Sequence, residues 1–132
     1  MYLLDTDILI YSLKGHAVVV AALKRHREDP MSVSVVSLME LYYGAHKSQR
    51  VESNLAKVRA IAASLEVLPV TEVCAETFGA LKATLETQGT PLDDLDLAIA
   101  ATALTRNLTL VTNNEAHFQR VPGLRVENWA HS

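Results

Sequence analysis

The sequence has one cysteine, no long apolar run and no excess of basic residues, and each absence excludes a class of protein. Cys74 alone cannot form an internal disulfide or a zinc site with several cysteine ligands. No apolar stretch approaches the roughly 18 residues of a membrane-spanning helix, and the first residues lack the basic start of a signal peptide. The 12 basic and 15 acidic residues leave a net charge of −3, which disfavours nonspecific coating of nucleic acid. We therefore expect a cytoplasmic protein without membrane contact.

The composition is that of a single globular domain over residues 1–132, with 49% hydrophobic and 20% charged residues. Short apolar runs alternate with stretches of helical period. The runs themselves show little polar alternation, which is typical of parallel strands covered on both faces. This order predicts a three-layer α/β/α domain with a central, mainly parallel sheet of about five strands. The predicted strands are Tyr2–Asp5, Ser32–Val36, Val67–Val70, Leu108–Thr112 and Leu124–Glu127.

The stretches between these runs have the spacing of helices. One apolar stripe recurs every three or four residues, at Leu55, Val58, Ala62 and Leu65. Thr71 is placed to cap the helix that follows. The segment Leu95–Leu104 is apolar nearly all round, which predicts a buried helix.

Three carboxylates lie in unusually apolar sequence. Asp5 ends the first predicted strand, Glu40 follows the second, and Asp96 opens the buried helix. A polar cluster that contains Asn113 and Asn114 follows the fourth strand. Ligands bind parallel sheets at the carboxyl ends of the strands, so we expect these side chains to meet in one crevice there.

Three carboxylates in one poorly solvated crevice raise one another's pKa and cost free energy to bury. A hard divalent cation relieves both problems, and Mg²⁺ or Mn²⁺ prefers carboxylate and water oxygens. The five histidines are scattered and offer no competing ligand set. A carboxylate-held ion can orient a water and neutralise charge on a phosphate, so the pattern favours metal-assisted phosphodiester hydrolysis.

Helix capping is the competing interpretation. Ser37 and Glu40 have the spacing of a capping box. Asp5 could cap the first helix, and Asn113 or Asn114 the last one. Capping explains any one of these residues, whereas their joint position after strands favours a metal site. Three further acids are interpreted as capping or exposed residues, namely Asp7, Asp93 and Asp94.

In order and spacing, these motifs resemble those of PIN-domain ribonucleases, and specifically of VapC toxins from prokaryotic type II toxin–antitoxin pairs. The similarity covers essentially the whole chain. It includes Leu4-Asp5-Thr6-Asp7-Ile8, Ser37-x-x-Glu40-Leu41-x-x-Gly44-Ala45, Asp96-x-x-Ile99-Ala100-Ala101, Leu110-Val111-Thr112-Asn113-Asn114 and Val121-Pro122-Gly123-Leu124 through Trp129.

The resemblance implies a site built on three acids. Asp5 and Asp96 match the principal Mg²⁺ ligands of the family, with Mn²⁺ as a substitute, and Glu40 matches the acid that joins them directly or through water. Many PIN domains carry a fourth acid where this chain has Asn114. An amide oxygen can bind a metal or its water but contributes no charge, so one tightly held ion, with a second brought in by the RNA phosphate, fits this chain better than two fully occupied metal sites.

The resemblance also implies an endoribonuclease that cuts structured RNA, tRNA or rRNA, and so inhibits translation. Such toxins form homodimers and are neutralised by a cognate antitoxin, through which alone they reach DNA. The candidate contacts to RNA phosphates are Lys14, Lys47, Arg50, Arg106 and Arg120, which follow or flank the crevice-side motifs.

Other functions remain open at the level of sequence. A degenerate domain would bind RNA or a protein partner without cleavage. The Asp5-x-Asp7 pattern also occurs in phosphohydrolases that use an aspartate nucleophile, although no matching lysine and paired-aspartate element follows it. Metal chemistry by itself does not distinguish RNA from DNA.

Overall fold

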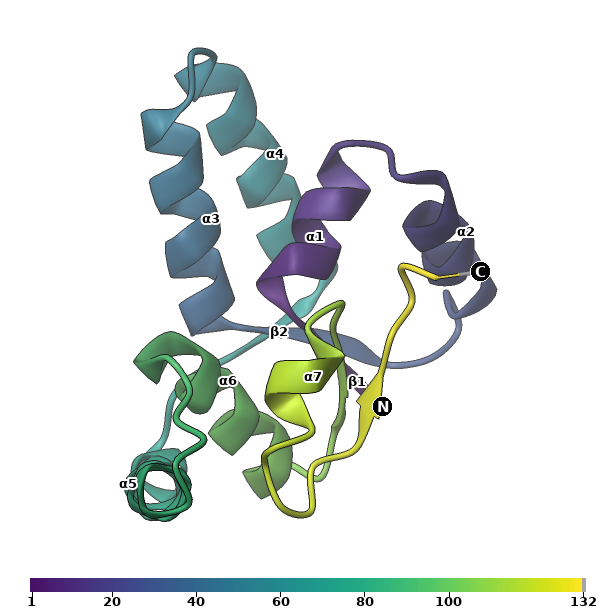
Figure 1. The fold of residues 1–132 in the computed structure, drawn as a ribbon. Helices are drawn as coiled ribbons and strands as arrows, with labels where there is room; N and C mark the ends of the chain where they lie inside the picture. The colour runs from purple at the N-terminus through teal and green to yellow at the C-terminus, as the bar shows by residue number, and fades with distance from the viewer. Residues whose placement is uncertain (132) are drawn as a thin grey trace.

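A computed structural model describes residues 1–131, in which five parallel strands form one sheet with the order β3-β2-β1-β4-β5 (Figure 1). All four strand pairs are parallel. The strands are β1 (Tyr2–Leu4), β2 (Met31–Ser34), β3 (Glu66–Leu68), β4 (Thr109–Val111) and β5 (Val126–Glu127). The prediction of a three-layer α/β/α fold with a parallel sheet is thus confirmed.

Seven helices lie within the described residues and cover both faces of the sheet. They are α1 (Thr6–Leu13), α2 (Ala17–Arg25), α3 (Val35–Lys47), α4 (Val51–Ser64), α5 (Glu72–Thr87), α6 (Asp94–Thr105) and α7 (Glu115–Phe118). In Figure 1, α3 and α4 run side by side as a pair that projects beyond the sheet. No single helix in residues 1–131 could span a membrane, although α1 and α2 together, bent by 108° at their junction, reach the required length and composition.

The sheet separates two apolar cores, because successive side chains of a strand point to opposite faces. Leu3 and Leu110 belong to the core beneath α5 and α6, whereas Leu4 and Val111 belong to the core beneath α1 to α4. Strands of three or four residues therefore contribute to both cores and carry no polar alternation. The predicted buried helix is confirmed as α6, whose residues Ile99–Ala103 are all buried.

The strands are shorter than predicted, and two of them, β1 and β2, pass almost directly into the helices α1 and α3. Ser34 ends β2 and also caps α3, where its side chain accepts a hydrogen bond from Val36 N. The predicted capping box is therefore wrong, because Ser37 lies inside α3. Thr71 caps α5 as predicted and accepts from Cys74 N. These direct strand-to-helix connections bring the first turns of α1 and α3 to the carboxyl edge of the sheet.

Candidate functional site

Asp5 lies between β1 and α1 at the carboxyl edge of the sheet. It is the N-cap of α1, and its Oδ1 accepts a hydrogen bond from Thr6 N at 2.8 Å. Its Oδ2 accepts from the Thr112 hydroxyl, which follows β4, also at 2.8 Å. Only 4% of Asp5 is exposed to solvent. A carboxylate is thus held by two donors in a place where water solvates it poorly.

Asp7 belongs to the same cluster of side chains as Asp5, whereas the sequence alone indicates only a capping or exposed residue. Its Oδ1 accepts from Ile8 N at 2.7 Å, as in a capping interaction, but its Oδ2 accepts from Asn113 N at 3.0 Å. The Thr112 hydroxyl also lies 3.4 Å from Asp7 Oδ2. Asp7 is half-buried rather than exposed, because β1 and β4 are neighbours and the first turn of α1 faces the segment after β4. The Asp-x-Asp spacing was the available signal.

Glu40 enters the site from α3. The Thr6 hydroxyl donates to Glu40 Oε1 over 2.7 Å and also contacts Ser37 Oγ at 2.9 Å. Ser37 is fully buried, and Glu40 is partly exposed. The hydroxyl of Thr6 therefore ties the glutamate of α3 to the residue next to Asp5.

Asp96 enters from the first turn of α6 and is half-buried. Burial raises the pKa of Asp96, and the negative charges of Asp93 and Glu40 raise it further. The structure thus brings Asp5, Glu40 and Asp96 to one edge of the sheet, as the sequence predicted. Asp93 is the N-cap of α6, without a side-chain capping bond, and Asp94 is exposed and pairs with Lys82 at 2.9 Å.

Within residues 1–131 no cationic side chain forms an ion pair with a site carboxylate, although the charge of His117 opposes the rise in the pKa of Asp96. The ion pairs there are His26–Asp29, Arg27–Glu28 and Lys82–Asp94, and none includes a site carboxylate. Burial raises the pKa of Asp5 to about 7, with a further contribution from the charge of Asp7. Burial likewise raises the pKa of Asp7, although its hydrogen bonds oppose the rise. The edge is therefore poised to bind a positive group.

The donor chemistry suits a hard divalent cation, since the acidic side chains gathered at this edge offer carboxylate oxygens. In the arrangement described for residues 1–131, no three acidic, histidine or cysteine side chains converge closely enough to hold one ion. Glu40 and Asp96 extend from two different helices toward the edge. Their side chains would have to turn, or act through water, to share an ion with Asp5.

Asn114 lies in the segment after β4, at the same edge as the carboxylates. It is the N-cap of α7, is exposed, and makes no side-chain capping bond. Its backbone N–H donates to Thr112 Oγ1 at 3.0 Å. Its connection to the carboxylates therefore runs through Thr112 and not through its own amide group.

A groove of about 380 Å³ lies between α1, α3 and α4 and reaches the site at Glu40. Its floor is mainly apolar, with residues such as Ile10, Leu41 and Val58, and Lys14 and Lys57 stand at its rim. Lys14 is thus on the same side of the molecule as the acids. The groove therefore adjoins the candidate site at Glu40.

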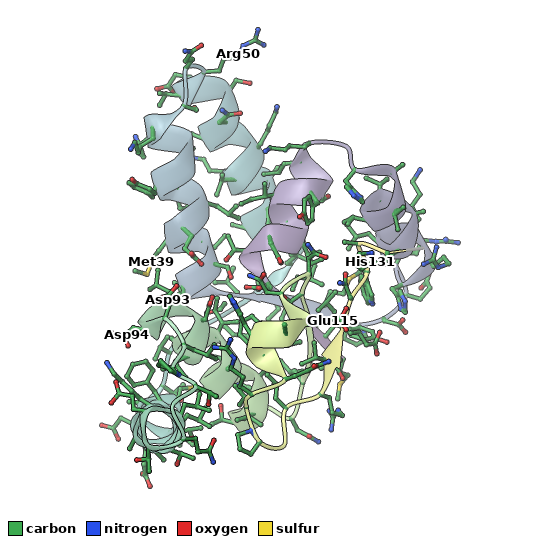
Figure 2. The ribbon with its side chains drawn as sticks, in the orientation of Figure 1. Met39, Arg50, Asp93, Asp94, Glu115 and His131 are labelled. Atoms are coloured by element: carbon green, nitrogen blue, oxygen red, sulfur yellow. The ribbon has the colours of Figure 1, made fainter. Side chains whose placement is uncertain are left out.

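The other predicted phosphate contacts lie in different places. Arg106 ends α6 next to Met1 and Pro30 at the amino edge, so the expectation that it flanks the crevice is wrong. α6 starts at the carboxyl edge with Asp96 and runs back along the sheet, which carries its last residues to the opposite edge. Figure 2 shows Arg50 at the tip of the α3–α4 pair, far from Met39 and Asp93. Arg120 donates to Pro91 O.

The fold and the site together define a parallel α/β protein with a cluster of acidic side chains at the carboxyl edge of its sheet. The model of the PIN domain family matches residues 2–124. The chain is 40% identical to the tRNA(fMet)-specific endonuclease VapC of Shigella flexneri, covering 98% of both chains, and 39% identical to ribonuclease VapC2 of Haemophilus influenzae, covering 97% of both. This chain belongs to the PIN-domain family, and within it to the VapC group.

Solved structures give the same relationship. The VapC chain in the DNA-bound VapBC complex of Salmonella typhimurium superposes with a TM-score of 0.90 at 38% identity, covering 97% of both chains. VapBC2 of Rickettsia felis, bound to a DNA fragment from its promoter, also gives a TM-score of 0.90, at 35% identity and 97% and 98% coverage. Both neighbours are toxin–antitoxin complexes.

Proposed function

We propose that this chain is a metal-dependent endoribonuclease, the toxin of a toxin–antitoxin pair, and that it hydrolyses phosphodiester bonds in structured RNA, either tRNA or rRNA. The observation that carries the proposal is the acidic edge. Asp5 is buried and bridged through Thr112 toward Asp7, and it has no cationic partner among residues 1–131. Relatives that are named ribonucleases over nearly the whole chain length support the choice of reaction.

Asp5, Asp96 and Glu40 would hold Mg²⁺ at this edge, with Mn²⁺ as a substitute. When bound, the ion neutralises charge on the scissile phosphate and lowers the pKa of the attacking water. The Thr112 and Thr6 hydroxyls hold Asp5 and Glu40 in place through hydrogen bonds of 2.8 and 2.7 Å. Asn114 adds no charge, which favours a single tightly held ion.

In this reaction the water oxygen bonds to phosphorus and the bond to the 3′-oxygen breaks. The products are a 5′-phosphate and a 3′-hydroxyl, and the 2′-hydroxyl of the RNA takes no part. Ends that carry a 2′,3′-cyclic phosphate would contradict this mechanism, because they require the 2′-oxygen as the nucleophile.

A cognate antitoxin is the proposed protein partner, and operator DNA is reached only through it, in line with the complexes among the structural relatives.

A homodimer of the toxin is supported by exposed apolar side chains on α3, where Met39 and Tyr43 are 57% and 65% exposed and one turn apart. Such large apolar side chains on one helix face favour burial against a second copy. A cytoplasmic location is part of the same proposal.

The test is cleavage of purified tRNA and rRNA by the antitoxin-free protein with Mg²⁺, Mn²⁺ or EDTA, followed by mapping of the new ends. Asp96→Asn removes a site carboxylate, and Asp94→Asn removes an exposed one two residues earlier on the same helix. We expect discrete metal-dependent cuts with the wild type and Asp94→Asn and none with Asp96→Asn. Folded protein that binds RNA but never cleaves it would instead indicate a degenerate domain.

A further inference from the structure

Two neighbouring asparagines follow β4, and the structure uses them differently. The side chain of Asn114 is exposed and makes no capping bond to α7. Asn113 is half-buried, and its backbone N–H donates to Asp7 Oδ2 at 3.0 Å. Of the two, Asn113 is therefore the residue in direct contact with a carboxylate of the site.

Partners on two other segments hold the side-chain amide of Asn113. Its Nδ2 donates to the hydroxyl of Tyr11 on α1 at 3.1 Å. Its Oδ1 accepts from Asn128 Nδ2 at 3.0 Å, and Asn128 is held in turn because its Oδ1 accepts from Ala130 N at 2.8 Å. Because the oxygen and the nitrogen of the amide are both used, the orientation of the Asn113 side chain is determined.

We call the two side-chain hydrogen bonds of Asn113, to Tyr11 and to Asn128, the clamp. It lies one residue beyond Thr112, whose hydroxyl holds Asp5. Thr112 Oγ1 donates to Asp5 Oδ2 and accepts from Asn114 N at 3.0 Å, so the backbone of residues 112–114 sets the positions of donors to both aspartates. A shift of this segment would move both donors together. Its geometry depends on contacts to α1 and to the segment after β5.

We propose that Asn113 is a positioning residue of the site. It touches no substrate, but it fixes the backbone through Tyr11 and Asn128 so that Thr112 and its own N–H hold Asp5 and Asp7 in place. The catalytic consequence of this inference rests on the proposed function, whereas the structural coupling can be measured without any activity.

Three variants test the proposal. Tyr11→Phe removes one hydroxyl from the clamp and keeps the ring, which packs against His16. Asn113→Ala removes both side-chain bonds. Asn107→Gly is the matched control, because Asn107 lies near the other end of β4, bonds only to Arg125 through its side chain, and has a φ of +55° that glycine adopts without strain.

Loss of one clamp hydrogen bond corresponds to about a 3- to 10-fold effect. We expect Tyr11→Phe to speed hydrogen exchange of the residue 113 amide by about that factor, with no change at Leu110 in β4. We expect kcat to fall by about the same factor in Tyr11→Phe and further in Asn113→Ala, with KM for RNA unchanged and Asn107→Gly like the wild type.

Unchanged exchange at residue 113 in Tyr11→Phe would overturn the proposal. So would a rise in KM at constant kcat in Asn113→Ala, since that pattern would make Asn113 an RNA contact. If Asn113→Ala does not fold, as judged by circular dichroism, Tyr11→Phe decides alone. A wild type that cleaves no RNA would refute the proposed function, and the exchange measurement would still decide whether the clamp holds the segment.

Discussion

Strand β4 begins with Thr109 and is followed by Thr112, and the two threonines have opposite surroundings. At the amino end, Thr109 Oγ1 accepts from Arg125 Nε at 3.3 Å, and the same arginine donates to the side chain and carbonyl oxygen of Asn107. At the carboxyl end, Thr112 is fully buried and donates to Asp5, with Asp7 close by. The amino end of β4 is thus hydrogen-bonded to a cationic side chain, Arg125. The carboxyl end lies next to two anionic side chains, Asp5 and Asp7.

The comparison shows where the molecule places uncompensated charge. At the amino edge, Arg125 donates to neutral oxygens of Asn107 and Thr109, and none of these hydrogen bonds involves a carboxylate. At the carboxyl edge, hydroxyl and backbone donors orient the aspartates but do not neutralise them. Hydrogen bonds lower the cost of burying a carboxylate without removing its charge, so the carboxyl edge retains an attraction for an external cation.

The largest effect on the rate of RNA cleavage is expected when each threonine is replaced separately by valine, which has the same shape but no hydroxyl. Thr112→Val removes a hydrogen bond to a buried carboxylate and should slow RNA cleavage by about 10- to 100-fold. Thr109→Val removes a partly exposed bond at the other edge and should leave the rate unchanged. Single-turnover cleavage of the mapped RNA measures both, and equal rates for the two variants would contradict the comparison.

The largest effect on stability is expected to be a pH dependence that comes from Asp5. Its pKa is about 7 in the folded protein and near 3.8 when unfolded, so the folded state binds the proton more tightly and stability falls as pH rises from about 4 to 7. Asp5→Asn keeps a good N-cap but no longer ionises. At pH 8 without metal, the variant should be more stable than the wild type by about 4 kcal/mol, and at pH 4 the two should be nearly equal.

Urea unfolding at the two pH values measures this difference. Asp94→Asn is the control, because Asp94 is exposed and paired with Lys82. If Asp5→Asn were less stable than the wild type at pH 8, ionised Asp5 would stabilise the folded protein. That result would contradict the conclusion that burying this charge destabilises it.

A smaller effect is expected from metal binding. At about ten times its Kd, Mg²⁺ should stabilise the wild type by about 1.4 kcal/mol at pH 8, a rise in Tm of several degrees. The rise should be lost in Asp5→Asn and kept in Arg125→Ala, which alters only the amino edge. Thermal unfolding in Mg²⁺ and in EDTA measures it, and an equal rise in Asp5→Asn would place the ion elsewhere.

The smallest effect is expected at the amino edge. Arg125→Ala removes exposed hydrogen bonds to Asn107 and Thr109 and should lower stability by about 0.5–1 kcal/mol, with RNA cleavage unchanged. Urea unfolding and the cleavage assay measure the two parts. A loss of cleavage at unchanged stability would show that the two edges are coupled.

Much of the fold and part of the site could be predicted from the sequence. The five strands, the buried helix α6 and the cap at Thr71 follow from local pattern, because burial on both faces of a parallel sheet removes polar alternation. The place of Asp7 and the role of Ser37 could not be predicted in this way. Both depend on whether α1 and α3 start at the end of a strand or a few residues later, and local sequence defines such boundaries poorly.

The sequence alone determined that apolar strands alternate with helices and that acids follow them, since hydrophobic periodicity and strand order are properties of the linear chain. Only the tertiary structure decided which polar groups meet. Asn113 and Asn114 are equivalent neighbours in sequence, yet Asn113 reaches Asp7, Tyr11 and Asn128 because β4 lies between β1 and β5. Hydrogen bonds between segments about 100 residues apart require a particular sheet order, and no local pattern encodes it.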